Sequence, residues 1–117
     1  MAFKFEQLKV WQKALDLTEG IDIMTKKFSK EELFVLTSQI KRATDSIALN
    51  IAEGSTGQSN SEFKKFLGYS IRSGIEVVAC LHVAKRRKLV NEEDFNDFYN
   101  KSEEIIKMLQ ALRKSIN

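Results

Sequence analysis

The sequence contains no proline, only five glycines and one cysteine in 117 residues. Proline and glycine interrupt helices, so their scarcity favours an all-α fold. A single cysteine leaves no internal disulfide, which excludes the class of small secreted proteins held together by disulfide bonds. No apolar run approaches the roughly 20 residues of a membrane span, and the first residues lack the apolar core of a signal peptide. We therefore expect a cytoplasmic protein without a membrane partner.

Histidine is as scarce as cysteine, and His82 is the single example. A di-iron helical bundle needs two Glu-x-x-His pairs, whereas the residue three positions before His82 is Ala79. Glu76 and Cys80 share a helical face, but His82 points elsewhere, so these residues do not form a local three-ligand metal site. Spacing alone does not exclude a Ser-His-Asp or Cys-His pair, yet nothing in the sequence marks one. We predict no catalytic residue, no metal site and no cofactor, with Cys80 and His82 packed in the core or at an interface.

Apolar and charged residues, by contrast, are both abundant. Hydrophobic residues make up 43% and charged residues 30% of the chain, which is typical of one globular domain over residues 1–117. Lysine and arginine number 19 against 16 acidic residues, so the net charge is +3. This mild excess permits an anionic partner but does not require one.

Apolar residues recur at alternating steps of three and four along four segments, which is the spacing of one helical face. The predicted helices span about 6–26, 30–53, 60–87 and 92–115. Ser29 and Ser59 each begin a capping box, and Asn91 caps the last helix. Gly54 is well placed as a left-handed residue that ends the second helix. Four amphipathic helices joined by short turns predict an antiparallel up-down-up-down four-helix bundle.

The third predicted helix is apolar on every side of one stretch. Nine of the eleven residues over 74–84 are non-polar, and they surround the helix. Such a helix is normally buried on all sides, so contact with a second copy of the chain is the simplest account. A tight core with a somewhat apolar surface is the alternative. We predict a self-associating bundle whose interface includes Ile75, Val78 and His82.

A row of polar residues runs along the second predicted helix beside its apolar stripe. We call it the polar row, and its members are Gln39, Arg42, Ser46, Asn50 and Glu53. Half-buried polar groups must find partners, so we interpret the row as a buried or interfacial hydrogen-bond network that fixes subunit geometry. A solvated face is the alternative.

The up-down topology brings the first interhelical turn and the third to the same end of the bundle. This end gathers seven cations that we call the basic pole: Lys26, Lys27, Lys30, Lys85, Arg86, Arg87 and Lys88. Repeated around an oligomer, they would form a ring able to bind phosphates by counterion release. Acidic residues at the same end and the preferences of helix dipoles favour the alternative of an ordinary solvated surface. No aromatic residue interleaves with the basic run, so base stacking is not indicated there.

Several segments are characteristic when taken together. They are Leu8-Lys9-Val10-Trp11-Gln12, Leu36-Thr37-Ser38-Gln39-Ile40-Lys41-Arg42-Ala43, Ser46-Ile47 with Asn50-Ile51-Ala52-Glu53-Gly54, and Ser61-Glu62-Phe63 with Phe66-Leu67. This set resembles the bacterial four-helix-bundle proteins encoded in 23S rRNA intervening sequences. The resemblance implies a ring-like homopentamer without a known catalytic activity. Related bundles are accessory proteins of retroelement reverse transcriptases, which implies RNA, DNA or a nucleic-acid-processing protein as a partner.

These observations lead to a prediction of a non-enzymatic, homo-oligomeric adaptor or scaffold, pentameric by the resemblance. We expect its basic pole to bind RNA or DNA weakly and without sequence specificity. The alternative is a pure protein-protein scaffold with no nucleic-acid role. A salt titration of binding to generic RNA separates the two, because contacts to phosphate weaken steeply as salt rises.

Overall fold

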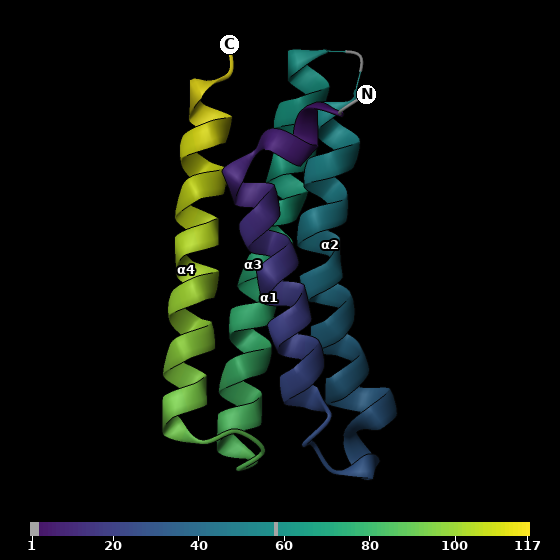
Figure 1. The fold of residues 1–117 in the computed structure, drawn as a ribbon, viewed down its shortest axis with the longest axis vertical. Helices are drawn as coiled ribbons and strands as arrows, with labels where there is room; N and C mark the ends of the chain where they lie inside the picture. Colours follow the sequence, from purple (N-terminus) through teal and green to yellow (C-terminus); the bar gives the residue numbers. More distant parts are fainter. Residues whose placement is uncertain (1–2, 58) are drawn as a thin grey trace.

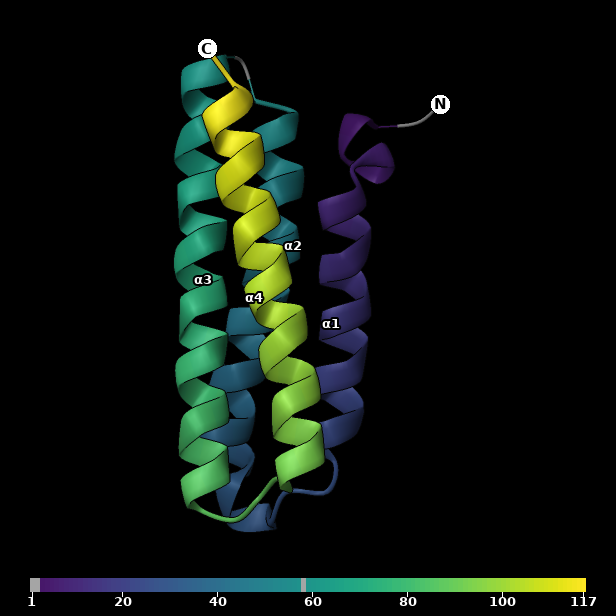
Figure 2. The same cartoon turned by 90° about the vertical axis from the view of Figure 1, so that its left-hand side faces the viewer.

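Four long helices lie side by side along the 43 Å axis of the molecule, in a computed structural model that describes residues 3–57 and 59–117 (Figures 1 and 2). They are α1 (Lys9–Thr25), α2 (Ser38–Ser55), α3 (Asn60–Arg86) and α4 (Glu92–Ser115). Short helical turns precede α1 and α2: η1 (Lys4–Gln7), η2 (Lys30–Glu32) and η3 (Leu33–Thr37). Successive long helices run in opposite directions, so the predicted all-α four-helix bundle is confirmed.

The apolar stripes of the four helices meet in one core. Ile21, Ile47, Leu81 and Ile105, one from each helix, are at most 1% exposed. A buried hydrogen bond also joins two helices, since the Ser70 hydroxyl of α3 donates to the Ile47 carbonyl of α2 at 3.0 Å. Burial of apolar surface at about 25 cal/mol per Å² therefore holds the bundle together, and the outer faces of the helices remain available for contacts.

The start of the second predicted helix differs from the expectation. Residues 30–37 form two irregular turns, η2 and then one turn of π-helix, η3, before regular α2 begins at Ser38. Within the described part of the chain, the Ser29 side chain makes no capping hydrogen bond, so the capping box predicted there is wrong. The reason is tertiary: the Glu32 carboxylate accepts from the Arg87 guanidinium at 2.8 Å and 3.0 Å instead.

The prediction that Gly54 ends α2 in a left-handed conformation is also wrong. Gly54 lies inside α2, and no glycine among the described residues has a positive φ. A Cβ at Gly54 would lie 2.5 Å from the Phe66 Cβ, so this glycine lets α2 and α3 approach closely. The left-handed residue is Lys88, with φ 61°, at the end of α3. There the Leu89 N–H donates to the Ala84 carbonyl at 2.9 Å, in the pattern of a Schellman motif.

The other two predicted helix starts are confirmed. The Ser59 hydroxyl accepts from the Glu62 N–H at 3.1 Å at the start of α3. The Asn91 side chain accepts from the Asp94 N–H at 2.7 Å at the start of α4. None of the helices in residues 3–57 and 59–117 has both the length and the apolar character needed to cross a lipid bilayer.

Candidate interaction surfaces

The three predicted interface residues of α3 follow at steps of three and four, which places them on one side of the helix, but they differ in exposure. Ile75 is 55% exposed, whereas Val78 is half-buried. His82, predicted to pack in the core or at an interface, is exposed in the single chain, and its ring lies edge-on to Phe95, with 5.1 Å between ring centroids. A second ring of α4, Tyr99, lies 6.1 Å away. His82 is therefore occupied within its own chain, and Ile75 alone of the three is an open apolar side chain.

Ile75 continues along α3 into an apolar strip that the prediction did not name. Ala79 and Val83 follow at four-residue steps, which places them on the same helical face, and both are exposed. They line a shallow groove of about 190 Å³ between α3 and the start of α2, which also includes Val35. We call the surface of Val35, Ile75, Ala79 and Val83 the apolar strip. It shows where the excess apolar surface of α3 lies.

The π-turn η3 contributes Val35 to this strip and exposes two further apolar residues toward a different groove. Phe34 is 88% exposed and Val35 54% exposed, and the adjoining Leu33 is open as well. A sequence signal for them existed, because Leu33 to Leu36 are four consecutive apolar residues and one helical stripe cannot bury them all. A single π-turn inside a helix is often found at a functional site.

The polar row lies on the outer side of α2, and its members are exposed or half-buried. Within the described chain, no hydrogen bond joins two side chains of the row. Gln39 donates to the Glu76 carboxylate of α3 at 3.3 Å, and Asn50 donates to the Ser46 backbone carbonyl at 2.8 Å. Arg42 and Ser46 line a groove of about 490 Å³ that also holds Phe34 and the exposed Leu49. A buried network within one chain is therefore excluded, since α2 already buries its opposite face.

The structure brings the basic pole together at one end of the bundle, where α1 ends and α3 turns into α4 (Figure 1). Three of its seven cations pair with carboxylates: Lys26 with Asp22 at 3.7 Å, Lys85 with Glu92 at 3.4 Å and Arg87 with Glu32 at 2.8 Å. Among the residues that the structure describes, no carboxylate lies within 4.0 Å of the other four, which are Lys27, Lys30, Arg86 and Lys88. The pole is thus partly neutralised.

Cys80 and Glu76 do not form a reactive site. Burial raises the pKa of the Cys80 thiol, and the nearby Glu76 carboxylate raises it further, so the thiol stays protonated at neutral pH. The side chain is 4% exposed, as expected for a packed residue. Over residues 3–57 and 59–117, no group of three or more His, Cys, Asp or Glu side chains is arranged to hold a metal ion.

Comparison with known proteins supports the resemblance seen in the sequence. The pattern of the 23S rRNA-intervening sequence protein family matches residues 6–111. The chain is also similar to the crystal structure of a protein of unknown function from the S23 ribosomal protein family of Bacteroides thetaiotaomicron, with a TM-score of 0.83 and 26% identity. That similarity covers 91% of this chain and 96% of the other. Among curated proteins, none matches the chain. With the family pattern covering most of the residues and the bundle fold in agreement, this chain belongs to the 23S rRNA-intervening sequence protein family.

Proposed function

We propose that this protein is a cytoplasmic, self-associating adaptor without catalytic activity, whose copies meet through the apolar strip of α3 and η3. The observation that carries the proposal is the exposure of Val35 and Val83 on one groove between α2 and α3, with the exposed Ile75 about two turns away on the outer side of α3. A contiguous apolar patch rimmed by polar groups is typical of a protein-protein interface. We take the assembly to be a homopentamer, as the family resemblance implies.

The polar row suits the rim of such an interface. Gln39 and Glu76 are hydrogen-bonded to each other across α2 and α3, beside the apolar strip. Arg42 lines a separate groove, together with Phe34 and Leu49. Partly exposed polar groups around an apolar centre are the usual anatomy of an interface, and they fix its geometry more than its affinity.

Negative charge introduced into the apolar strip should dissociate the assembly into single chains. We expect the wild-type protein to sediment as a species several times the 13.4 kDa chain mass, and the Ile75→Glu/Val83→Glu variant to sediment as single chains. Burying two unpaired carboxylates in each contact costs more than an apolar interface of this kind contributes. Both side chains are exposed in the single chain, so circular dichroism should show unchanged helicity.

The matched control is Ile23→Glu on α1, because Ile23 is 56% exposed, almost the same as Ile75, but lies outside the strip. This variant should assemble like the wild-type protein. A wild-type protein that sediments as single chains at all concentrations, or an Ile75→Glu/Val83→Glu variant that still assembles, would overturn the proposal.

A second candidate function is weak binding of nucleic acid by the basic pole, and the four cations without a carboxylate partner favour it. We expect Lys27→Glu/Arg86→Glu to lower the affinity for labelled oligouridine at low salt by about tenfold or more, because each lost phosphate contact reduces counterion release. Lys27 and Arg86 are chosen because neither takes part in an ion pair between described residues. If this variant binds oligouridine as tightly as the wild type, the basic pole is not a nucleic-acid site, and the protein-protein scaffold remains the proposed function.

A further inference from the structure

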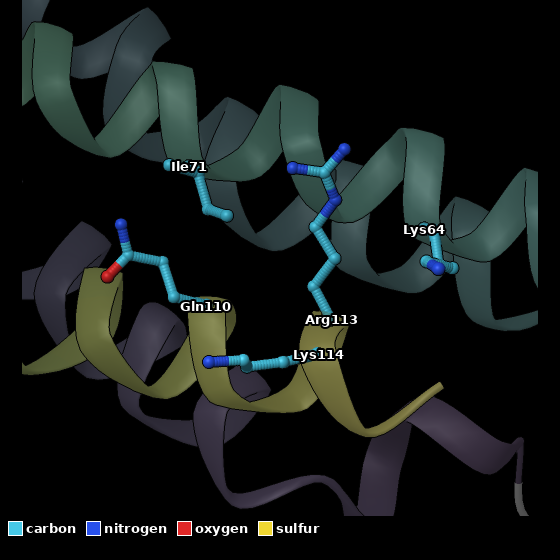
Figure 3. Close-up of a pocket in the computed structure, with 5 residues that line it drawn as sticks. All are labelled: Lys64, Ile71, Gln110, Arg113 and Lys114. Carbon is cyan, nitrogen blue, oxygen red and sulfur yellow. The ribbon is translucent and has the colours of Figure 1, made fainter. Parts of the chain in front are cut away.

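A second basic surface lies at the end of the bundle opposite to the basic pole, where α3 begins and α4 ends (Figure 1). One groove there, of about 530 Å³, is lined by Lys64, Ile71, Gln110, Arg113 and Lys114 (Figure 3). An adjoining groove of about 450 Å³ is lined by Ser61, Lys64, Lys65, Arg113 and Asn117. Lys64 and Arg113 line both, so the two form one continuous surface, which we call the α3–α4 basic groove.

Among the described residues, the cations of this groove form no ion pair. In the part of the protein that the structure describes, no carboxylate lies within 4.0 Å of Lys64, Lys65, Arg113 or Lys114, and no acidic side chain lines either groove. The basic pole differs, because three of its cations are paired. The side chains of the α3–α4 basic groove are therefore less neutralised than those of the basic pole.

Local helix preferences do not account for the two lysines. Lys64 and Lys65 lie in the second turn of α3, beyond the first turn over which the helix dipole acts, so the dipole gives no reason for cations there. Arg113 extends from α4 across to α3 (Figure 3), and its guanidinium lies against Gly68, with its carbon 3.6 Å from where a Cβ would stand. Cations from two helices thus converge on one groove, and a bound anion would relieve their mutual repulsion.

An exposed aromatic ring lies among the cations on the outer face of α3. Lys65, Tyr69 and Arg72 follow at steps of four and three, which places them on one side of the helix. Tyr69 is 42% exposed, and the Phe66 ring supports it edge-on with 5.4 Å between ring centroids. Aromatic rings between cations act as stacking platforms for the bases of single strands. The basic pole has no such ring interleaved with its basic run.

We propose that single-stranded nucleic acid binds across the α3–α4 basic groove and the adjoining outer face of α3, with Lys64, Arg113 and Lys114 on its phosphates and Tyr69, one turn from the groove-lining Lys65, stacked on a base. The cations and the ring span about 12 Å of α3, at 1.5 Å per residue, which suits a short stretch of strand. This site depends neither on self-association nor on the basic pole.

The test is a salt titration of fluorescence anisotropy with a labelled oligouridine of about 20 nucleotides. We expect Lys64→Glu/Arg113→Glu to lower the affinity at least tenfold near 50 mM salt. We also expect it to reduce the slope of log affinity against log salt by about 1.4, since each contact to single-strand phosphate contributes about 0.7. The control Lys101→Glu/Lys107→Glu changes net charge equally but removes cations already paired with Asp97 and Glu103, so its loss should be much smaller.

Tyr69→Ala separates a nucleic acid from other sources of phosphate. Loss of one stacked base should weaken oligouridine binding about 5- to 150-fold while leaving the salt slope unchanged. Binding of inorganic polyphosphate, which has no bases, should not change in this variant. If the charge-reversal pair fails to fold by circular dichroism, Lys64→Gln/Arg113→Gln should show a smaller loss in the same direction.

Three results would overturn the inference. The first is a wild-type protein that does not bind oligouridine at low salt, and the second is a charge-reversal variant that binds as tightly as the wild type. The third is a Tyr69→Ala variant with unchanged oligouridine affinity, which would leave only a general anion site. Loss of binding in Lys27→Glu/Arg86→Glu alone would place the contact at the basic pole instead.

Discussion

Replacing Ile47 with alanine is expected to lower the free energy of unfolding by about 2–5 kcal/mol. Ile47 is completely buried in the middle of α2. Its Cδ1 lies 3.9 Å from the position of a Cβ at Gly74 of α3, and its carbonyl accepts the hydrogen bond from Ser70. Truncation would leave a cavity between α2 and α3, because close-packed helices relax only partly around a removed side chain.

Urea unfolding followed by circular dichroism measures this loss, with Leu49→Ala as the control. Leu49 is two residues away on the same helix but 66% exposed, so its truncation should change the unfolding free energy by less than about 0.5 kcal/mol. Repeating the series at several protein concentrations separates subunit dissociation from unfolding. Equal losses at the two positions would mean that α2 does not face the core as the structure has it.

A second large effect is expected at Gly54, where alanine should destabilise the protein by about 2 kcal/mol. Alanine in place of glycine inside a helix normally stabilises by about 1 kcal/mol, so the predicted sign is the opposite of the usual one. The added methyl group would lie 2.5 Å from the Phe66 Cβ and 3.2 Å from the Phe63 ring. The Phe66 Cβ is attached to the α3 backbone and cannot swing away, so the two helices must separate.

Gly68→Ala is the matched control in the neighbouring helix. Its nearest contact would be the Arg113 guanidinium at 3.6 Å, an ordinary van der Waals distance. This variant should therefore gain up to about 1 kcal/mol from helix propensity alone. Stabilisation by both alanines would contradict the close approach of α2 and α3 at Gly54, and with it the placement of the first turns of α3.

The outer face of α3 is divided along its length, and the division matters for the two proposals. Lys65, Tyr69 and Arg72 occupy its first half, and the apolar residues Ile75 and Val83 occupy its second half. If copies meet through the second half, the first half of each subunit stays open beside the contact. Self-association would then bring several basic grooves close together, and binding through linked sites raises the overall affinity for a long strand.

The sequence alone determined the bundle, because the three-four spacing of apolar residues states directly which side of each helix is buried. Ile21, Ile47, Leu81 and Ile105 follow from that rule, as do the side-chain caps at Ser59 and Asn91, which involve only neighbours within three residues. The family could also be named from short segments, and the match over residues 6–111 confirms it. These features depend on contacts that are local or averaged over a whole helix face.

Only the tertiary structure decided which particular side chains meet. The Glu32 carboxylate accepts a hydrogen bond from Arg87, 55 residues away, instead of completing the predicted capping box. Gly54 does not end α2 but allows α2 and α3 to pack closely. Arg113 joins Lys64 only because α3 and α4 are antiparallel in a specific register. A helical pattern gives the direction of a residue around its own axis, but the axial offset and separation of two helices depend on the packing of the whole core. The charge of each surface, and therefore what it can bind, was settled at that level.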